Sequence, residues 1–447
     1  MTDRANRAVS PTSRAVLLAT ILLATGGALF FDRPPPPEPE TAPAGEFSAM
    51  RALAHLRVIA AAPRPIGSEG HAKALAYIVE TLRANGLEPE IQAARFPAPR
   101  SGASRDGRVQ NVVAVLPGRR AGRGPALLLA SHHDSVTAGP GASDDGAAVA
   151  AMLETLRALR SGPPLANDIV FLFTDAEELG LDGARAFAAE HALAGRIGVA
   201  LNFEARGSRG PVFMFQTSGD NGWLIDQLAA SAPHIAATSL AGEVYRRMPN
   251  DTDFTVFLAR GMSGMNFAYI GGVRHYHTAG DTIENLDLGS LQHHGSYMLA
   301  LARRLGDADL SSPRGPDAVY FSLAGDVFVH YSSAWVQPLL ALAGLVFLAA
   351  LVHGVRRGLI RWRALASLGL LVAVMVVTGL ALAGVTLAVV ELDPHFTPTG
   401  EHRAVYDGGA YMLAFAALAA VIAAALYALS ARLVSAAELA AGALAGW

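Results

Sequence analysis

Residues 126–134 read ALLLASHHD, an apolar run that passes directly into Ser131, two histidines and Asp134. Two later stretches share this design: residues 169–178 read IVFLFTDAEE, and residues 197–204 read IGVALNFE. Apolar runs of this length, without a polar face, are typical of strands that are buried on both sides in a parallel sheet. Open α/β sheets bind ligands at the carboxyl ends of their strands. We therefore expect the histidines and carboxylates after these runs to lie in one crevice.

Further strand-like runs lie at residues 111–115, 212–215 and 265–270, and helical stretches separate many of them. An amphipathic helix is expected from Ser68 to Asn85, closed by Gly86, with others at residues 147–159 and 184–191. Strands that alternate with helices in this way predict an α/β domain over residues 47–310. The expected fold is a mostly parallel sheet with helices on both faces.

Composition limits the kinds of protein this chain can be. Its 447 residues are 52% hydrophobic and only 16% charged, which is too apolar for a wholly soluble protein and indicates membrane segments. A net charge of −3 provides no basic field for nucleic acid, so nucleic acid is not an expected partner. The absence of cysteine excludes disulfides and thiolate ligands, so any metal must be held by His, Asp and Glu.

Four apolar runs without Asp, Glu, Lys or Arg are long enough to cross a bilayer, at residues 15–31, 335–352, 364–390 and 411–429. For the first run the alternative is a cleaved signal peptide. Residues 1–14 are expected to form a cytoplasmic tail and the Pro-rich residues 32–46 an extended spacer. Residues 311–334 would be a linker and residues 335–447 a multi-span region. Its last part, 436–447, resembles the start of another apolar helix, and the alternatives for it are a truncated chain or a short terminal hairpin.

Arginine placement predicts the orientation of these spans. Arg4, Arg7 and Arg14 precede the first run, and four arginines lie between residues 353 and 363, whereas the loop 391–409 holds Arg403 alone. Arginine excess marks the cytoplasmic side of a membrane. The α/β domain should therefore be non-cytoplasmic, and we expect an integral protein of a bacterial plasma or inner membrane.

Two further segments add metal-binding groups to the same sheet edge. Residues 141–146 read GASDDG, a turn that places an acid before a helix, and residues 275–278 read HYHT after the run 265–270. Taken singly, a His-x-Asp, an Asp pair or a Glu pair is more often an ordinary cap or solvated helix face. When these groups occur together after buried strands, a metal site is favoured over such ordinary roles, because so many buried carboxylates require a cation.

Five motifs, in chain order, resemble those of the M28 family of zinc metallopeptidases and in particular its membrane-anchored branch. They are His132-x-Asp134, 141–146 GASDDG, 175–180 DAEELG, 202–207 NFEARG and 276–278 YHT. The resemblance implies a zinc-exopeptidase-like fold with two zinc ions bridged by Asp144. It implies that the other ligands are His132, Glu178, Glu204 and His277, and that Glu177 is the general base. Glu204 departs from the soluble aminopeptidases of the family, which have Asp there.

The residue types fit this chemistry without the family. A carboxylate beside a zinc-activated water, here Glu177, can take the proton and return it to the leaving amine. Asp134 is placed to fix the ring of His132. Tyr276 is either a donor to the oxyanion or a buried structural tyrosine. His133 and His275 would face away from their ligand neighbours in an extended chain and are left out of the site.

The function expected from these observations is a membrane-anchored two-zinc exopeptidase, with an aminopeptidase as the first interpretation. A one-zinc acyl transferase similar to glutaminyl cyclases is an alternative, which the full set of five ligands argues against. A catalytically inactive binding subunit of the same fold is another, although neither ligands nor base are missing. A transporter would need charges within its spans. Arg206 and Arg274 could bind the carboxylate of a peptide, so a carboxypeptidase is a further alternative. Peptides and the lipid bilayer are the expected partners, and the oligomeric state stays open.

Overall fold

The computed structural model describes residues 33–95, 108–248, 250–323, 327–358, 360, 364–392, 408–430 and 438. The chain divides into two compact units, one of which is Leu23–Ser333 and the other Ala334–Trp447 together with Met1–Leu22.

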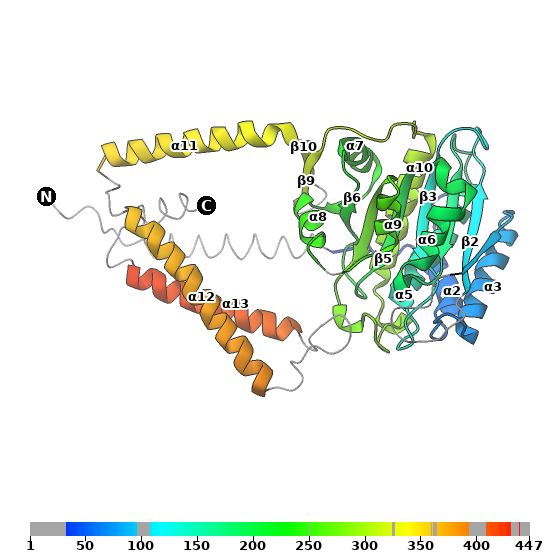
Figure 1. The fold of residues 1–447 in the computed structure, drawn as a ribbon, viewed down its shortest axis with the longest axis horizontal. Coiled ribbons are helices and arrows are strands. Elements are labelled where there is room, and N and C mark those ends of the chain that lie inside the picture. The colour runs from blue at the N-terminus through cyan, green and yellow to red at the C-terminus, as the bar shows by residue number, and fades with distance from the viewer. Residues whose placement is uncertain are drawn as a thin grey trace. The chain divides into compact units, whose positions relative to one another are not determined.

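An eight-stranded sheet forms the centre of the first unit (Figure 1), in the order β1-β2-β4-β3-β5-β8-β6-β7. The strands are β1 Glu90–Arg95, β2 Arg108–Leu116, β3 Ala126–His132, β4 Ile169–Thr174, β5 Ile197–Ala205, β6 Phe213–Thr217, β7 Ala236–Ala237 and β8 Ser263–Tyr269. The four central strands, β4, β3, β5 and β8, are mutually parallel, while β2 and β6 flank them antiparallel. Every strand expected from the sequence is present, and the mostly parallel sheet is confirmed.

Helices cover both faces of this sheet, as expected (Figure 1). They are α2 Ala49–Ile59, α3 Glu69–Ala84, α4 Ala148–Arg160, α5 Glu177–Gly180, α6 Asp182–Glu190, α7 Gly222–Ser231, α8 Ser239–Tyr245, α9 Asp253–Ala259 and α10 Leu288–Asp307. Side chains alternate along β3: Leu127 and Leu129 pack with α2, α4 and α10, whereas Leu128 and Ala130 pack with α6 and α9. This two-residue period explains why the runs are apolar throughout, since both faces of each strand are buried.

The predicted boundaries of α3 are confirmed by its capping. The Ser68 side chain accepts a hydrogen bond from the backbone N–H of His71 at the start of the helix. At the other end, Gly86 adopts a φ of +72°, a conformation that glycine tolerates without strain.

The Pro-rich stretch does not stand free as a spacer where the structure describes it. Arg51 of α2 donates hydrogen bonds to the carbonyl oxygens of Glu40 and Ala42, and Arg157 of α4 donates to that of Ala44. A chain rich in proline makes few internal hydrogen bonds, so its carbonyls are available to guanidinium groups. These contacts hold the stretch against the domain.

The segment expected as a linker contains a β-hairpin. Strands β9 Ala318–Ser322 and β10 Phe328–Ser332 pair antiparallel, and a short turn, Ser333–Trp335, follows. The two five-residue segments, AVYFS and FVHYS, are too short and lack the strict apolar–polar alternation that would distinguish a strand from a linker.

The second unit contributes α11 Val336–Arg356, α12 Ala364–Leu392 and α13 Gly408–Ser430. One helical stretch, Ser333–Arg356, is long and apolar enough to cross a membrane, with a mean hydropathy of 2.2 and almost no burial within the protein. The apolar stretches recognised in α12 and α13 are shorter, Met375–Val389 and Leu413–Ala425. The expected run 15–31 lies outside the described residues, as does 436–447 apart from Glu438.

Candidate metal centre

The predicted site residues come from the carboxyl ends of neighbouring parallel strands. His132 is the last residue of β3, Glu204 lies near the end of β5, and Glu178 lies in the short helix α5 that follows β4. His277 follows the turn after β8, and Asp144 lies in the turn Ala142–Ala147 that leads into α4. Because these strands are adjacent and parallel, their ends deliver all five side chains to one edge of the sheet.

Asp144 stands at the centre of this group. Its Oδ1 lies 3.0 Å from Nε2 of His132, and its Oδ2 lies 2.9 Å from Nε2 of His277. On one side Glu204 Oε2 lies 3.7 Å from the His132 nitrogen, and on the other Glu178 Oε2 lies 3.0 Å from the His277 nitrogen. We call His132, Asp144 and Glu204 triad A, and Asp144, Glu178 and His277 triad B. The ligand atoms within each triad lie within 4.8 Å of one another.

The donor set fits zinc. Two imidazoles and three carboxylates supply the nitrogen and oxygen ligands that zinc accepts. The side chains of Asp144, Glu178 and Glu204 are nearly inaccessible, and Oε1 of Glu178 is buried with no hydrogen-bond partner. A buried carboxylate oxygen without a donor is unfavourable unless a cation neutralises it.

The pKa values of these side chains also favour a bound cation. Burial raises the pKa of Glu204 well above its ordinary value, and the nearby charges of Asp145 and Asp144 raise it further. Burial also raises the pKa of Glu178, with Asp144 adding to the effect. By contrast, burial alone would lower the pKa of His277, but hydrogen bonds to Asp144 and Glu178 raise it to about 10. Protonated imidazoles here supply positive charge that a divalent cation can supply instead.

Asp134 connects triad A to the predicted base. Its two carboxylate oxygens accept hydrogen bonds from the backbone N–H groups of Glu177 and Glu178, and Oδ1 lies 3.4 Å from Nδ1 of His132. One side chain thus orients a predicted ligand and the turn that carries the base. The sequence predicted only that Asp134 orients His132. The structure adds a second contact, to the backbone of α5, which follows a different strand.

Glu177 and Tyr276 flank the cluster. Burial raises the pKa of Glu177 well above its ordinary value, although the charge of His132 opposes this, and the charges of Glu204 and Glu178 raise it further. The ring of Tyr276 stacks on His277 with centroids 3.9 Å apart. Burial, with the negative charge of Asp144, raises the pKa of Tyr276 as well, so its hydroxyl keeps its proton and can donate it in a hydrogen bond.

Sequence reasoning missed Arg64, which is fully buried beneath the site. Its Nε donates to the carbonyl of His133, and its two terminal nitrogens donate to the carbonyls of Pro140 and Gly141. These bonds join the end of β3 to the loop that carries Asp144. In the sequence Arg64 stands between two prolines and is indistinguishable from a surface arginine.

Two further acids hold the backbone of the site and were also missed. Asp281 accepts hydrogen bonds from the N–H groups of Ser143 and Asp144. Asp175 accepts from Nε2 of His71 and from the backbone of Ala176, which has a φ of +60°. A short polar residue in a turn gives no sequence signal for such roles, because the partners are fixed by folding.

Two other histidines next to predicted ligands, His133 and His275, lie outside the two triads. His133 stacks on His71 with centroids 5.0 Å apart and contacts the carbonyl of Gln110. His275 bonds through Nδ1 to the Ser208 hydroxyl, and Arg274 donates to its other nitrogen. Both histidines were left out of the predicted site, and neither belongs to triad A or triad B.

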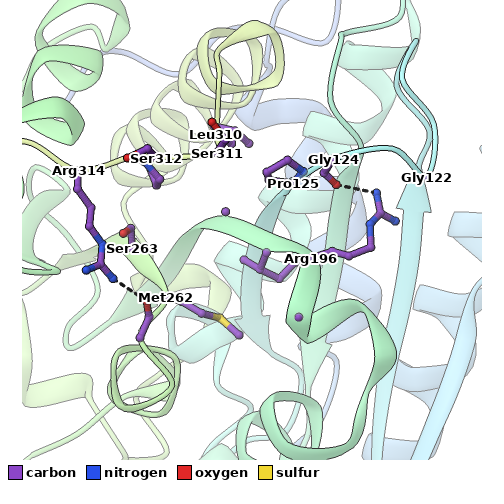
Figure 2. Close-up of a pocket in the computed structure, with 15 residues that line it drawn as sticks. Gly122, Gly124, Pro125, Arg196, Met262, Ser263, Leu310, Ser311, Ser312 and Arg314 are labelled. Carbon is purple, nitrogen blue, oxygen red and sulfur yellow. Dashed lines mark hydrogen bonds between the residues drawn. The ribbon is translucent and has the colours of Figure 1, made fainter.

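A separate cavity of about 590 Å³ opens at the amino ends of the parallel strands (Figure 2). Pro125, Ile197 and Ser263, at or just before the starts of β3, β5 and β8, line it together with two arginines. Arg196 donates to the carbonyl of Gly124 and Arg314 to that of Gly261. This cavity lies at the sheet edge opposite the triads, so it is not part of the metal centre.

The fold and the two triads define an α/β protein with a candidate metal centre of His and carboxylate ligands. Residues 111–302 match the family model described as Peptidase family M28, and the chain accordingly contains an M28 peptidase domain. Mouse (Mus musculus) endoplasmic reticulum metallopeptidase 1 is 33% identical over 311 residues, which cover 65% of this chain and 34% of that protein. The vacuolar membrane protease of Candida dubliniensis is 32% identical over 213 residues, 47% of this chain and 23% of that one.

Among solved structures, a zinc aminopeptidase from Bacillus subtilis is similar with a TM-score of 0.48 and 16% identity, covering 60% of this chain and 98% of that one. The chain spans about a third of the length of the endoplasmic reticulum metallopeptidases it matches. The predicted family resemblance is confirmed. The expected bacterial plasma or inner membrane finds no support in these relatives, whose names refer to the endoplasmic reticulum and a vacuolar membrane.

Proposed function

We propose that the chain is a membrane-anchored two-zinc exopeptidase that releases residues from the amino end of peptides. The observation that carries this proposal is the position of Asp144, which presents one carboxylate oxygen to each triad. Two triads that share a carboxylate suit a pair of ions, since a bridging carboxylate serves both. Triad A would hold one zinc and triad B the other.

Bound zinc supplies Lewis-acid activation of a water molecule and of the scissile carbonyl. Glu177 acts as the general base: it accepts the proton of the attacking water and passes it to the nitrogen of the breaking C–N bond. Burial raises the pKa of Glu177 above its ordinary value, which makes the carboxylate a stronger base toward the attacking water. The Tyr276 hydroxyl donates a hydrogen bond to the oxygen that becomes negative as water adds.

The charge of the site favours the amino end of a peptide over the carboxyl end. Asp134, Asp144, Glu177, Glu178 and Glu204 surround one edge of the sheet. With two zinc ions bound, these five carboxylates would keep one net negative charge, which complements the cationic α-amino group of a peptide and repels its carboxylate. The exposed Arg274 contacts His275 and supplies no buried countercharge.

The experiment that tests the proposal combines Glu177→Gln with peptide substrates of defined ends. We expect the variant to keep its zinc, measured by elemental analysis, while turnover of a peptide with a free amino end falls about 10²- to 10⁴-fold. Blocking the amino end of the substrate should abolish cleavage by the native chain, and blocking the carboxyl end should not.

Glu190→Gln is the matched control, because Glu190 is an exposed glutamate in α6. It should retain native turnover. Unchanged turnover in Glu177→Gln would exclude this base. Cyclisation of peptides with amino-terminal glutamine, without hydrolysis of other peptides, would favour the acyl transferase instead.

Membrane anchoring rests on the stretch Ser333–Arg356, which is apolar and almost entirely exposed. A soluble helix of this length normally has a polar face, and burying this one in lipid removes its apolar surface from water. We propose that it crosses the bilayer, together with the apolar runs 15–31, 364–390 and 411–429.

A further inference from the structure

Helix α8 carries an apolar stripe that the rest of the domain does not cover. Leu240 and Val244 are 67% and 51% exposed, and Met248, just after the helix, is 38% exposed. Residues four apart lie on one face of a helix, so the two helical side chains point the same way. Two large apolar residues on one exposed helix face, with a third exposed just after the helix, are unusual, whereas single ones are not.

The β9–β10 hairpin, which contacts α8, exposes two more large apolar side chains. Leu323 and Val327, at the turn end of the hairpin, are each 52% exposed. The hairpin is attached to α8 because the Ser239 hydroxyl donates to the carbonyl of Tyr320 and accepts from its N–H. Helix α8 and β9 lie side by side at one end of the sheet (Figure 1). We call Leu240, Val244, Met248, Leu323 and Val327 the apolar patch.

The chain itself limits what can cover this patch. Strand β10 ends at Ser332, and the membrane-crossing stretch begins at the next residue, Ser333. Val327 lies six positions before Ser333, a distance of at most about 20 Å at roughly 3.3 Å per residue. If the stretch enters the bilayer at its first turn, the turn end of the hairpin lies within about 20 Å of the lipid surface.

Two sets of side chains, one at the start of the apolar stretch and one following α8, are of the kinds found in a lipid headgroup region. Trp335, at the start of the apolar stretch, is 59% exposed, and tryptophan is enriched at the boundary between lipid and water. Arg246 and Arg247 follow directly after Tyr245 and are exposed, with Glu243 as their shared partner. The three charges leave a net positive charge beside the patch, which complements anionic lipid.

We propose that the apolar patch rests on the lipid bilayer, so that the peptidase domain is held against the membrane surface by α8 and the hairpin. This surface is distinct from the metal centre, and it depends on membrane insertion of Ser333–Arg356 but not on catalysis. Burying the patch in the headgroup boundary removes its apolar area from water, while the arginines contact phosphate groups.

The absence of native cysteine allows a direct test on the full chain. Leu240→Cys, Val244→Cys and Leu323→Cys are labelled singly with an environment-sensitive fluorophore and reconstituted into phosphatidylcholine vesicles containing one-quarter phosphatidylglycerol. Lipids that carry a spin label near the headgroup should quench each of these sites at least about twofold more strongly than the controls. Val58→Cys and Ile91→Cys are matched controls, because both residues are exposed aliphatic side chains, 44% and 41%, on other elements.

The readout needs no turnover, so it is independent of the proposed peptidase activity. Equal quenching at patch and control sites would overturn the proposal. So would a blue-shifted emission at the patch without lipid quenching, which would indicate a second copy of the chain or a protein partner. A full chain that does not float with the vesicles would also overturn it.

Discussion

Two carboxylates of the candidate metal centre, those of Asp144 and Asp134, each contact different groups with their two oxygens. Asp144 presents one oxygen to His132 and the other to His277, and hydrogen bonds from these rings hold the pKa of Asp144 below its ordinary value despite burial. Asp134 likewise divides its oxygens between the N–H groups of Glu177 and Glu178. Such carboxylates cannot be replaced by amides without losing charge that the neighbours require.

The residue-scale prediction concerns Asp144→Asn, which preserves shape but removes the charge. We expect both zinc ions to be depleted, because each triad loses its shared anionic ligand. Elemental analysis of the purified protein gives the zinc content per chain, with Asp309→Asn, an exposed aspartate outside the site, as the control. Retention of two zinc ions by the variant would show that Asp144 does not bridge them.

At the scale of elements, buried side chains join segments that are distant in sequence. Arg64 lies 76 residues before Pro140, yet it binds the loop that positions Asp144. Burial lowers the pKa of this guanidinium, but the surrounding acids oppose that effect, and arginine stays charged at any working pH. The loop before α4 therefore has a fixed support beneath it.

Replacing Arg64 with lysine should weaken the connection between the end of β3 and the loop that carries Asp144. Lysine keeps the charge but cannot reach three carbonyls with a planar fork, and hydrogen bonds to charged groups contribute about 1.5–3 kcal/mol each. We expect a loss of several degrees in Tm by calorimetry and weaker zinc retention during dialysis against a chelator. Arg57→Lys, in the exposed part of α2, should change neither, and an unaltered Tm in Arg64→Lys would contradict the supporting role.

The long helix α10 contains a buried histidine that makes the stability of the folded chain depend on pH. His294 is fully buried beside Phe203 and Tyr269, and neither of its ring nitrogens has a hydrogen-bond partner. Burial, reinforced by the charge of His293, lowers the pKa of His294 to about 3. The unfolded chain binds a proton here below about pH 6.5, whereas the folded chain does not. Stability present above pH 6.5 is therefore lost as pH falls toward 3.

Replacing His294 with leucine should remove this contribution. Between pH 6.5 and 4.5 the free energy of unfolding of the native chain should fall by roughly 2–3 kcal/mol more than that of His294→Leu, at about 1.4 kcal/mol per pH unit. Urea unfolding at the two pH values measures the difference. His330→Leu, at an exposed position of β10, should match the native chain, and parallel pH profiles for native and His294→Leu would disprove the assignment.

For the whole molecule, the arrangement of arginines predicts which side of the membrane holds the peptidase domain. Residues 1–14 and 353–363 are rich in arginine, and the loop 391–409 is not. We expect the domain and that loop on the non-cytoplasmic side. In sealed vesicles of known orientation, protease should digest the domain only from the non-cytoplasmic face. Digestion only from the cytoplasmic face would reverse the proposed topology.

Much of the fold and of the candidate site could be predicted because the signals are local. The runs in β3, β4 and β5 are apolar at every position, and the polar residues that follow them mark the carboxyl edge of a parallel sheet. The sequence therefore placed His132, Glu178 and Glu204 at one edge before any contact was known. The helix caps at Ser68 and Gly86 were equally local, since they depend on neighbours within a few residues.

Tertiary structure alone decided the features that depend on distant partners. Arg64, His71 and Asp281 read as ordinary polar residues, and only folding brings them to the backbone of the site. The Pro-rich stretch was expected to stand free, but arginines of α2 and α4 bind its carbonyls. Sequence patterns record which face of an element is apolar, whereas the partner of a buried polar group is set by long-range packing. For this reason the sequence predicted the edge that holds the ligands, and the family resemblance implied a bridging Asp144, but only the folded chain showed which side chains share each of its oxygens.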